Sequence, residues 1–147
     1  MLGEEDLNPG GFHRMPPGLR LASMMTPAIV SLGDGSRIAL GSGGSNRIRS
    51  AILQVLANVF EYGFDLEQAV VAPRLHLEQD HLSIEKGFSA SARAALEAEW
   101  PGVEQWPEGN LFFGGVHAVQ RFADGKFSAA GDPRRGGAVA IAQSGSL

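Results

Sequence analysis

The stretch that most constrains this chain is LGSGGSNRIRSAILQVLANVF, residues 40–60, where a glycine- and serine-rich turn leads directly into a segment with regularly spaced apolar residues. The apolar residues recur every three or four positions, which is the spacing of one helical face. They are Ile48, Ala51, Ile52, Val55, Leu56, Val59 and Phe60. We therefore predict a helix that is capped by Ser45 or Asn46 and stopped by Gly63.

The turn before this helix, Ser42 to Asn46, suits a negatively charged oxygen, because backbone amides at a helix start are free to donate. A phosphate-binding loop is disfavoured, since no lysine follows the glycines and their spacing is G-x-G-G. Two interpretations remain open. The turn is either a strand-to-helix connection that needs glycine for its backbone geometry, or an oxyanion hole made by adjacent amides.

Short apolar runs separated by turn signals predict the other elements. Residues 28–32 and 37–41 flank Gly33-Asp34-Gly35, which is a strong hairpin signal. Helices are predicted from Asp65 to Pro73 and from Ser89 to Pro101-Gly102. Further strands are predicted at 81–85, 114–122 and 126–131, followed by a last apolar run at 138–142.

This order of elements predicts an α+β fold with an antiparallel sheet packed against helices. We expect a single domain over residues 1–147. Residues 1–22, which are rich in proline and glycine, are expected to form an extended lead-in to it.

Composition narrows the function classes. The formal net charge is −4, from 12 basic and 16 acidic residues, so nucleic acid is not an expected partner. No apolar run approaches the roughly 20 residues of a membrane-spanning helix, so no membrane is expected either. The chain has no cysteine, which removes disulfides and thiolate chemistry. As it stands the chain would be cytoplasmic, whereas a longer precursor could be periplasmic or secreted.

Few side chains point to chemistry on their own. The histidines lack the i, i+4 spacing of a helical zinc site, and we expect neither a metal nor a cofactor. His117, on an alternating strand, is predicted to pack rather than to catalyse. Thr26 is the only threonine, and no serine lies in a G-x-S-x-G elbow. Loop residues that could bind a substrate, but are more often turn formers or ion-pair partners, are Asp6, Asp34, Arg74 and Asp132.

Several segments taken together resemble one family. They are RLASMMTPAIV (20–30), LGSGGSNRI (40–48) with the helix after it, AVVAPRLH (69–76), IEKGF (84–88) and GDPRRGGAVA (131–140). In order and spacing they resemble the C-terminal portion of the small subunit of gamma-glutamyltransferases, the glutathione hydrolases of the N-terminal-nucleophile superfamily. The resemblance implies part of a four-layer αββα sandwich, shared between two subunits that arise by self-cleavage of one precursor.

The activity that the resemblance implies is transfer of a gamma-glutamyl group from glutathione or a related amide to water or an amine acceptor. An N-terminal threonine is the nucleophile in this family, and its own amine acts as the base. Asp6 is similar to the aspartate that holds the substrate's α-amino group. Ser23 and Met24 fall on a serine pair that binds the α-carboxylate, with Met24 in place of the second hydroxyl.

The family's oxyanion hole consists of two adjacent backbone amides in the turn after residue 42. Matching the glycines places it on Gly43 and Gly44, whereas counting back from Arg47-Ile48 places it on Gly44 and Ser45. Both assignments remain open, and both use backbone amides rather than side chains.

The resemblance also implies missing parts. The family nucleophile lies upstream of the Asp6 segment, so we expect this chain to lack it, to need a large-subunit polypeptide or upstream segment, and to be inactive alone. Two alternatives are a truncated, non-catalytic paralogue acting as a binding or assembly module, and a relative that cleaves another N-acyl amide, for which Met24 is the argument. A sheet without its partner should expose apolar surface, so self-association is also expected.

Overall fold

The structure, a computed structural model, describes residues 5 and 7–142. The described residues before Ala28 form turns, bends and irregular segments without a helix or strand. None of the helices in the described part is long and apolar enough to cross a lipid bilayer.

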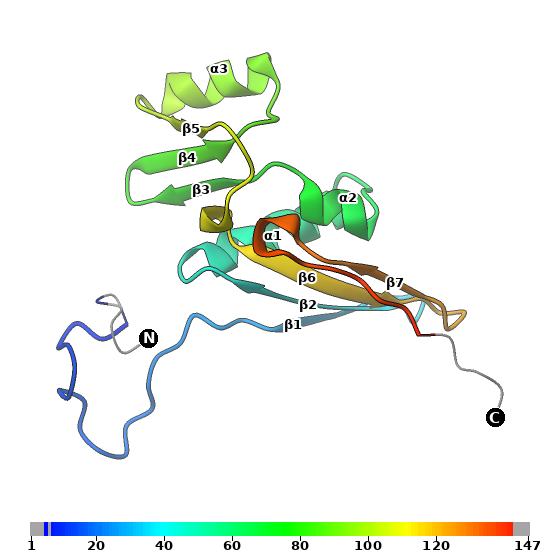
Figure 1. The fold of residues 1–147 in the computed structure, drawn as a ribbon, viewed down its shortest axis with the longest axis horizontal. Coiled ribbons are helices and arrows are strands. Elements are labelled where there is room, and N and C mark those ends of the chain that lie inside the picture. The colour runs from blue at the N-terminus through cyan, green and yellow to red at the C-terminus, as the bar shows by residue number, and fades with distance from the viewer. Residues whose placement is uncertain (1–4, 6, 143–147) are drawn as a thin grey trace.

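Four antiparallel strands form the larger sheet, in the order β1-β2-β6-β7 (Figure 1). They are β1 (Ala28–Ser31), β2 (Arg37–Gly43), β6 (Gly115–Arg121) and β7 (Phe127–Ala130). Both predicted hairpins are present. The Asp34 and Asp124 carboxylates each accept a hydrogen bond from the amide two residues later, which fixes the turns.

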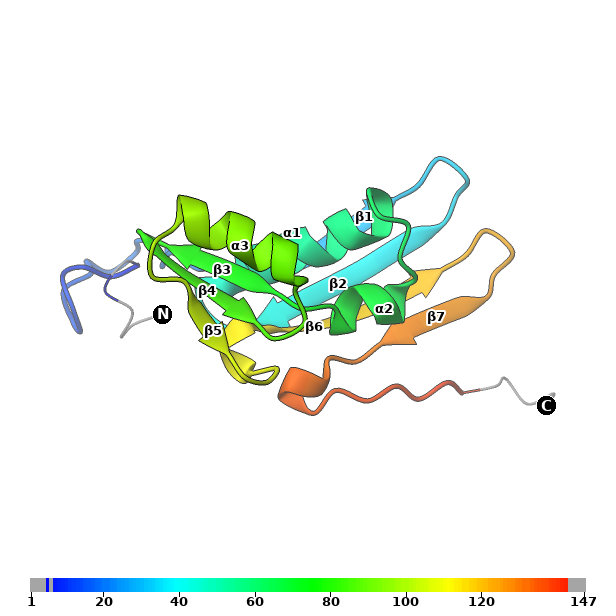
Figure 2. The ribbon, with the colours of Figure 1, turned by 90° about the horizontal axis from the view of Figure 1, so that it is seen from above.

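Helices α1 (Arg47–Phe60) and α2 (Leu66–Val71) cover one face of this sheet (Figures 1 and 2). The predicted apolar stripe of α1 packs against alternate residues of β2 and β6. The buried core consists of Ile38, Leu40, Ile48, Ala51, Ile52, Val55, Leu66, Ala69, Val70, Val116, Ala118 and Ala130. Asp65 caps α2 as predicted, in a capping box with Gln68.

The predicted side-chain cap of α1 is wrong. Asn46 occupies the N-cap position but makes no capping bond. Its φ of −55° and ψ of −28° are helical, whereas a capping side chain needs an extended backbone to reach the amides that follow. The Asn46 amide instead donates to the Glu78 carboxylate.

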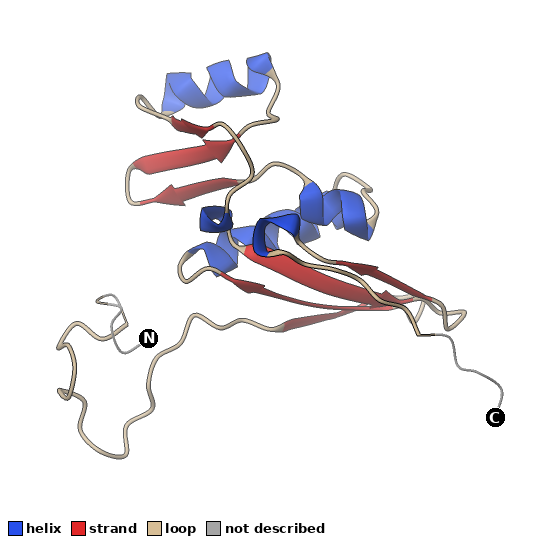
Figure 3. Ribbon diagram, viewed as in Figure 1, coloured by secondary structure: helices blue, strands red, loops and turns tan. Residues whose placement is uncertain are grey.

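A smaller sheet contains β3 (Leu75–Glu78), β4 (His81–Glu85) and β5 (Glu104–Trp106), and α3 (Ala90–Glu99) connects β4 to β5 (Figure 3). β4 is antiparallel to β3 and parallel to β5. The sequence predicted β4 and α3, with Ser89 as the N-cap of α3, but not β3 and β5. These two strands have four and three residues, and no Asp-Gly turn marks them as it marks the hairpins of the larger sheet.

The face of the larger sheet turned away from α1 and α2, here called the open face, carries no helix in the described part (Figure 1). Strand register places Ile29, Ala39, Val119 and Ala129 in one row across it. Ile29 is 76% exposed and Val119 46% exposed. The remaining members of the open face are Ser31, Arg37, Gly41, Gly43, Gly115, His117, Arg121 and Phe127.

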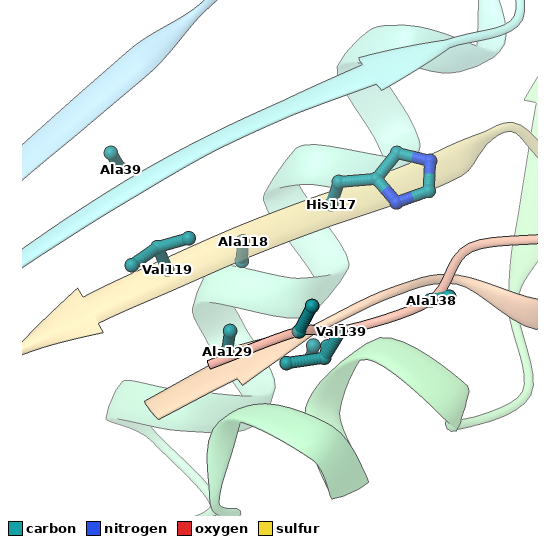
Figure 4. Close-up of a pocket in the computed structure, with 9 residues that line it drawn as sticks. Ala39, His117, Ala118, Val119, Ala129, Ala138 and Val139 are labelled. Atoms are coloured by element: carbon teal, nitrogen blue, oxygen red, sulfur yellow. The ribbon is translucent and has the colours of Figure 1, made fainter. Parts of the chain in front are cut away.

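His117, predicted to pack rather than to catalyse, lies on this open face and is exposed, and its ring lies against the backbone at Gly137 rather than in the core. Val116 and Ala118 take the inward positions of β6, and alternation turns His117 outward. Figure 4 shows its ring beside a recess that Val119, Ala129 and the Ala138–Ala140 segment also line. That segment belongs to the last apolar run of the sequence but forms no strand.

A buried ion network joins the two sheets. Asp132 pairs with Arg74 at 2.8 Å and with Arg134 at 3.2 Å, and Arg134 also pairs with Glu85. All four side chains are at most 5% exposed. Burial raises the pKa of Asp132, but the charge of Arg74, the hydrogen bonds from the Arg134 and Val116 amides and the charge of Arg134 together outweigh that effect and hold it below its usual value. The ion-pair role expected for Arg74 and Asp132 is therefore present.

We expect Arg134→Met to lower the free energy of unfolding by about 3–5 kcal/mol, because it leaves the Glu85 carboxylate buried without its partner. Lys126→Met is the control. It breaks the exposed Lys126–Asp124 pair and should change stability by less than about 1 kcal/mol. Urea unfolding of both variants measures the difference, and similar losses would show that the network is not a principal anchor.

Candidate functional site

In the turn that joins β2 to α1, Gly43–Asn46, the chain changes direction within two residues. Gly43 is the last residue of β2 and pairs with Gly115 of β6. Gly44 then has a φ of +130° and Ser45 a φ of +53°. The Gly44 and Ser45 carbonyls accept the first helical hydrogen bonds, from Arg47 and Ile48. Gly44 and Ser45 thus lie beyond the strand pairing and before the helix.

Glycine is required at Gly44 for two reasons. Its φ belongs to the region that side chains disfavour, and a Cβ there would lie 2.9 Å from the Gly114 Cα. In the described part of the chain, no oxygen accepts a hydrogen bond from the Gly44 amide. The two backbones touch, and the Gly44 N–H is left available to an anionic ligand.

The structure brings Met24 to this turn. The Ser45 hydroxyl donates to the Met24 Sδ over 3.4 Å, and Met24 also packs against the hydrophobic core. Ser23 is exposed, and its hydroxyl accepts a hydrogen bond from the Met25 amide. The hydroxyl of Thr26, the only threonine of the chain, donates to the Met24 carbonyl. Asp6 lies outside the described residues.

Glu78 holds the start of α1 from the neighbouring strand β3. Its carboxylate accepts a hydrogen bond from Asn46 and lies 3.8 Å from Arg47 and 3.5 Å from the His76 Nε2. His76 Nδ1 in turn lies 2.7 Å from the hydroxyl of Ser50, one turn along α1. Sequence reasoning missed Glu78, because its role depends on a strand that was not predicted.

These contacts shift the pKa values of Glu78 and His76 from their usual ranges. The hydrogen bond from Asn46, and the proximity of His76, hold the pKa of Glu78 below its usual value. Burial lowers the pKa of His76, and this outweighs the opposing effect of Glu78. His76 is therefore neutral at pH 7 and Glu78 is charged.

Arg47 is fixed from the other side by the 3-10 helix η1 (Leu111–Phe113). Its Nε donates to the Phe112 carbonyl over 3.2 Å, and its guanidinium stacks 4.7 Å from the centre of the Phe112 ring. The first turn of α1 is thus held by β3 and by η1. Among the described residues no group of three or more His, Asp or Glu side chains could hold a metal ion.

The sequence matches the family model described as gamma-glutamyltranspeptidase over residues 3–142. The chain belongs to the gamma-glutamyltranspeptidase family. A relative, the glutathione hydrolase proenzyme of Escherichia coli, is 32% identical over 127 residues, which are 85% of this chain and 21% of that protein. The acylase ACY 1 proenzyme of Pseudomonas sp. (strain V22) is 31% identical over 142 residues, or 97% and 25% of the two chains.

The fold agrees with solved structures. The gamma-glutamyltranspeptidase of Pseudomonas nitroreducens superposes with a TM-score of 0.72 at 28% identity, over 88% of this chain and 67% of that one. The transpeptidase CapD of Bacillus anthracis superposes with a TM-score of 0.74 at 28% identity, over 86% of this chain and 75% of that one. The mixed α+β architecture with antiparallel strands is therefore that of the family. The chain spans about a fifth to a quarter of the curated relatives it matches, which are described as proenzymes.

Gly44→Ala tests whether the β2–α1 turn requires the close contact between the backbones of Gly44 and Gly114. Gly35→Ala is the matched control, because Gly35 has a φ of +89° but nothing within 4 Å of an added Cβ. Both variants place a residue with a Cβ atom at a positive φ, which costs about 1–2 kcal/mol. Gly44→Ala should lose about 1–3 kcal/mol more because of the overlap. If urea unfolding gave equal losses of free energy for the two variants, the Gly44–Gly114 contact would be loose enough to accept a methyl group.

His76 predicts a pH dependence of stability. Because the pKa of His76 in the folded chain lies below its ordinary value of 6.5, the unfolded chain takes up this proton first as pH falls. Stability should therefore decline below about pH 6.5, and His76→Gln should flatten the slope between pH 7 and 5. His13→Gln, in the exposed lead-in, is the control. Urea unfolding at several pH values gives the slopes, and an unchanged slope in His76→Gln would contradict this assignment.

Proposed function

We propose that this chain is the C-terminal part of the small subunit of an enzyme that transfers a gamma-glutamyl group from glutathione or a related amide to water or an amine. The observation that carries the proposal is the β2–α1 turn, with the Gly44 and Ser45 residues beyond the strand pairing and the Gly44 amide available. Family membership supports the same conclusion.

The proposed oxyanion hole uses the backbone amides of Gly44 and Ser45. Gly43 is the weaker candidate, because it lies inside the pairing with β6. Amides placed at a turn before a helix are fixed in advance by the fold, and they stabilise negative charge on a tetrahedral intermediate without reorganising. Glu78 and Arg47 hold the turn in place from outside.

The remaining parts of the reaction would come from sequence outside these 147 residues. An N-terminal threonine hydroxyl attacks the amide carbonyl, and its α-amino group takes the hydroxyl proton. When the C–N bond breaks, that proton goes to the leaving amine. Water or an acceptor amine then attacks the resulting ester, gives up a proton by the same route and regenerates the hydroxyl.

Asp6, Ser23 and Met24 are proposed to line the acyl side of this site. Asp6 would pair with the α-ammonium of a glutamyl group, and Ser23 would donate to its α-carboxylate. The contact between Met24 and Ser45 supports a place for Met24 beside the hole. Its thioether offers no hydrogen-bond donor, so binding of a carboxylate there rests on Ser23.

We also propose that residues 1–147 form one domain that completes a four-layer αββα sandwich with a large subunit. The open face is the surface to be covered, since Ile29, Val119 and Phe127 are 76%, 46% and 56% exposed on it. Left uncovered, such a face favours self-association of the isolated chain.

A second candidate is cleavage of an N-acyl amide whose acyl group lacks the α-amino group. Met24 favours it, because an apolar side chain stands where a carboxylate-binding hydroxyl is expected. The similarity to an acylase proenzyme over 97% of this chain also favours it. A third candidate, a non-catalytic assembly module, is an outcome of the experiment below.

The experiment compares Met24→Ser with Met25→Ser. Met25 is the matched control because it is the neighbouring methionine and is 69% exposed. Each is co-expressed with the upstream or large-subunit polypeptide and assayed with a gamma-glutamyl anilide and with an acyl anilide lacking the amino group. We expect wild-type turnover of the glutamyl substrate, and a KM about tenfold lower in Met24→Ser because a hydroxyl is regained. Preference for the other anilide would favour the second candidate, and no turnover of either would favour the third.

A further inference from the structure

Two arginines of the open face stand directly opposite each other on neighbouring strands. Arg37, the first residue of β2, pairs in register with Arg121, the last residue of β6. Both side chains are exposed, and neither makes an ion pair within the described part of the chain. The Cβ atoms of directly opposed residues in an antiparallel pair lie about 5 Å apart, where two like charges repel and destabilise the sheet.

The open face carries arginine but no acidic residue. A third arginine, Arg135 at the end of the 3-10 helix η2 (Pro133–Arg135), lies at the other end of the face, where a Cβ added at Gly115 would overlap its side-chain stem. Arg135 is exposed, whereas Arg134 beside it is buried in the ion network. None of the open-face residues is an aspartate or glutamate, although the chain has a net charge of −4. The positive charge of this face is therefore not a consequence of overall composition.

The Arg37–Arg121 pair lies far from the β2–α1 turn. β2 has seven residues, and at about 3.3 Å per residue its first residue is roughly 20 Å from its last. The pair stands instead beside the two hairpins, which lie together at one end of the larger sheet (Figure 2). A group bound there is separate from a substrate at the turn, so the pair concerns recognition of another surface rather than the reaction.

The surroundings of the pair are those of a protein interface. Phe127 lies next to Arg121 in register and is 56% exposed. The exposed apolar row that includes Ile29 and Val119 follows two residues further along the strands. Arginine and aromatic side chains are enriched in interfaces between proteins. A folded polypeptide layer would cover both the charges and the apolar row, whereas a small anion would leave the row in water.

Covering this face takes the two guanidinium groups out of water. A buried charge without a partner is strongly destabilising, whereas a carboxylate with good geometry offsets much of that cost. The covering surface must therefore supply negative charge at this end, and one carboxylate between two arginines can accept hydrogen bonds from both. A second copy of this chain, laid with its own open face on this one, has no acidic side chain there to supply it.

We propose that the polypeptide that covers the open face carries an aspartate or glutamate whose carboxylate binds between Arg37 and Arg121, an inference that rests on the proposed four-layer assembly. The chain spans about a fifth to a quarter of the curated relatives it matches, which leaves ample length in the family for such a layer. The contact fixes the position of the layer on the sheet. It also discriminates against a layer with a neutral or basic residue at that point.

The first measurement is a carbodiimide cross-link in the assembled protein. Carbodiimide joins a lysine amine to a carboxylate in contact with it and does not join arginine. The chain has only two lysines, Lys86 and Lys126, so Arg37→Lys and Arg121→Lys each add one reactive position to a nearly empty background. After co-expression with the upstream or large-subunit polypeptide, mass spectrometry should find positions 37 and 121 joined to one acidic residue of that polypeptide.

The second measurement is the dissociation constant between the two polypeptides. Arg37→Met and Arg121→Met should each raise it at least about tenfold, because each leaves the partner's carboxylate buried with fewer donors. Lys86→Met removes the same charge from an exposed turn outside the open face and should leave the constant unchanged. In the isolated chain neither arginine variant should lose stability to urea, since removing one of two opposed like charges relieves repulsion.

A cross-link to the covering polypeptide, together with weaker association of both methionine variants, supports the assignment. Association as tight as in the wild type, or an assembled protein without the cross-link, would overturn it, as would a cross-link that joins two copies of this chain. Neither measurement uses a substrate, so an assembled protein without turnover counts against the proposed reaction alone. If the two polypeptides do not associate, the four-layer assembly and this contact both fail.

Discussion

The buried carboxylate of Asp132 is the interaction on which most of this structure depends. One oxygen accepts from the Val116 amide at the start of β6 and pairs with Arg74, while the other accepts from the Arg134 amide. A single side chain thereby joins the larger sheet, the segment before β3 and η2. An unpaired carboxylate in this place would be costly. Arg74 and Arg134 therefore neutralise the buried charge of Asp132 and also connect the elements.

This anchoring has a direct effect on the β2–α1 turn. Asp132 fixes the start of β6, and Gly114, immediately before that strand, is the backbone against which Gly44 packs. Glu78 and Phe112 then hold the first turn of α1 from two other elements. The amides proposed to stabilise an oxyanion are thus positioned by contacts between segments that are distant in sequence, which suits a site that must not reorganise during reaction.

The features that could be predicted from sequence are local ones. Hairpins at Asp34 and Asp124 and the caps at Asp65 and Ser89 depend on residues within a few positions of one another. The family was identified from several segments in order, since the glycine turn alone left its role open.

The features that were missed depend on pairing across the fold. β3 and β5 are strands because β4 lies between them, and Glu78 contacts α1 only once β3 is in place. The outward direction of His117 required knowing which face of β6 the helices cover. The asymmetry between Arg134 and Arg135, two identical residues in succession, has no signal in the sequence at all.

The adjacency of Arg134 and Arg135 has a consequence for how such a site can vary. One arginine points into the ion network and the next lies on the open face, within the same short helix. Substitutions that shift η2 would move both side chains together, so the effects on stability of changing the two arginines should be non-additive. Variation of the exposed arginine is therefore tied to the tolerance of the buried ion network, and changes at the two positions are expected to accumulate jointly rather than independently.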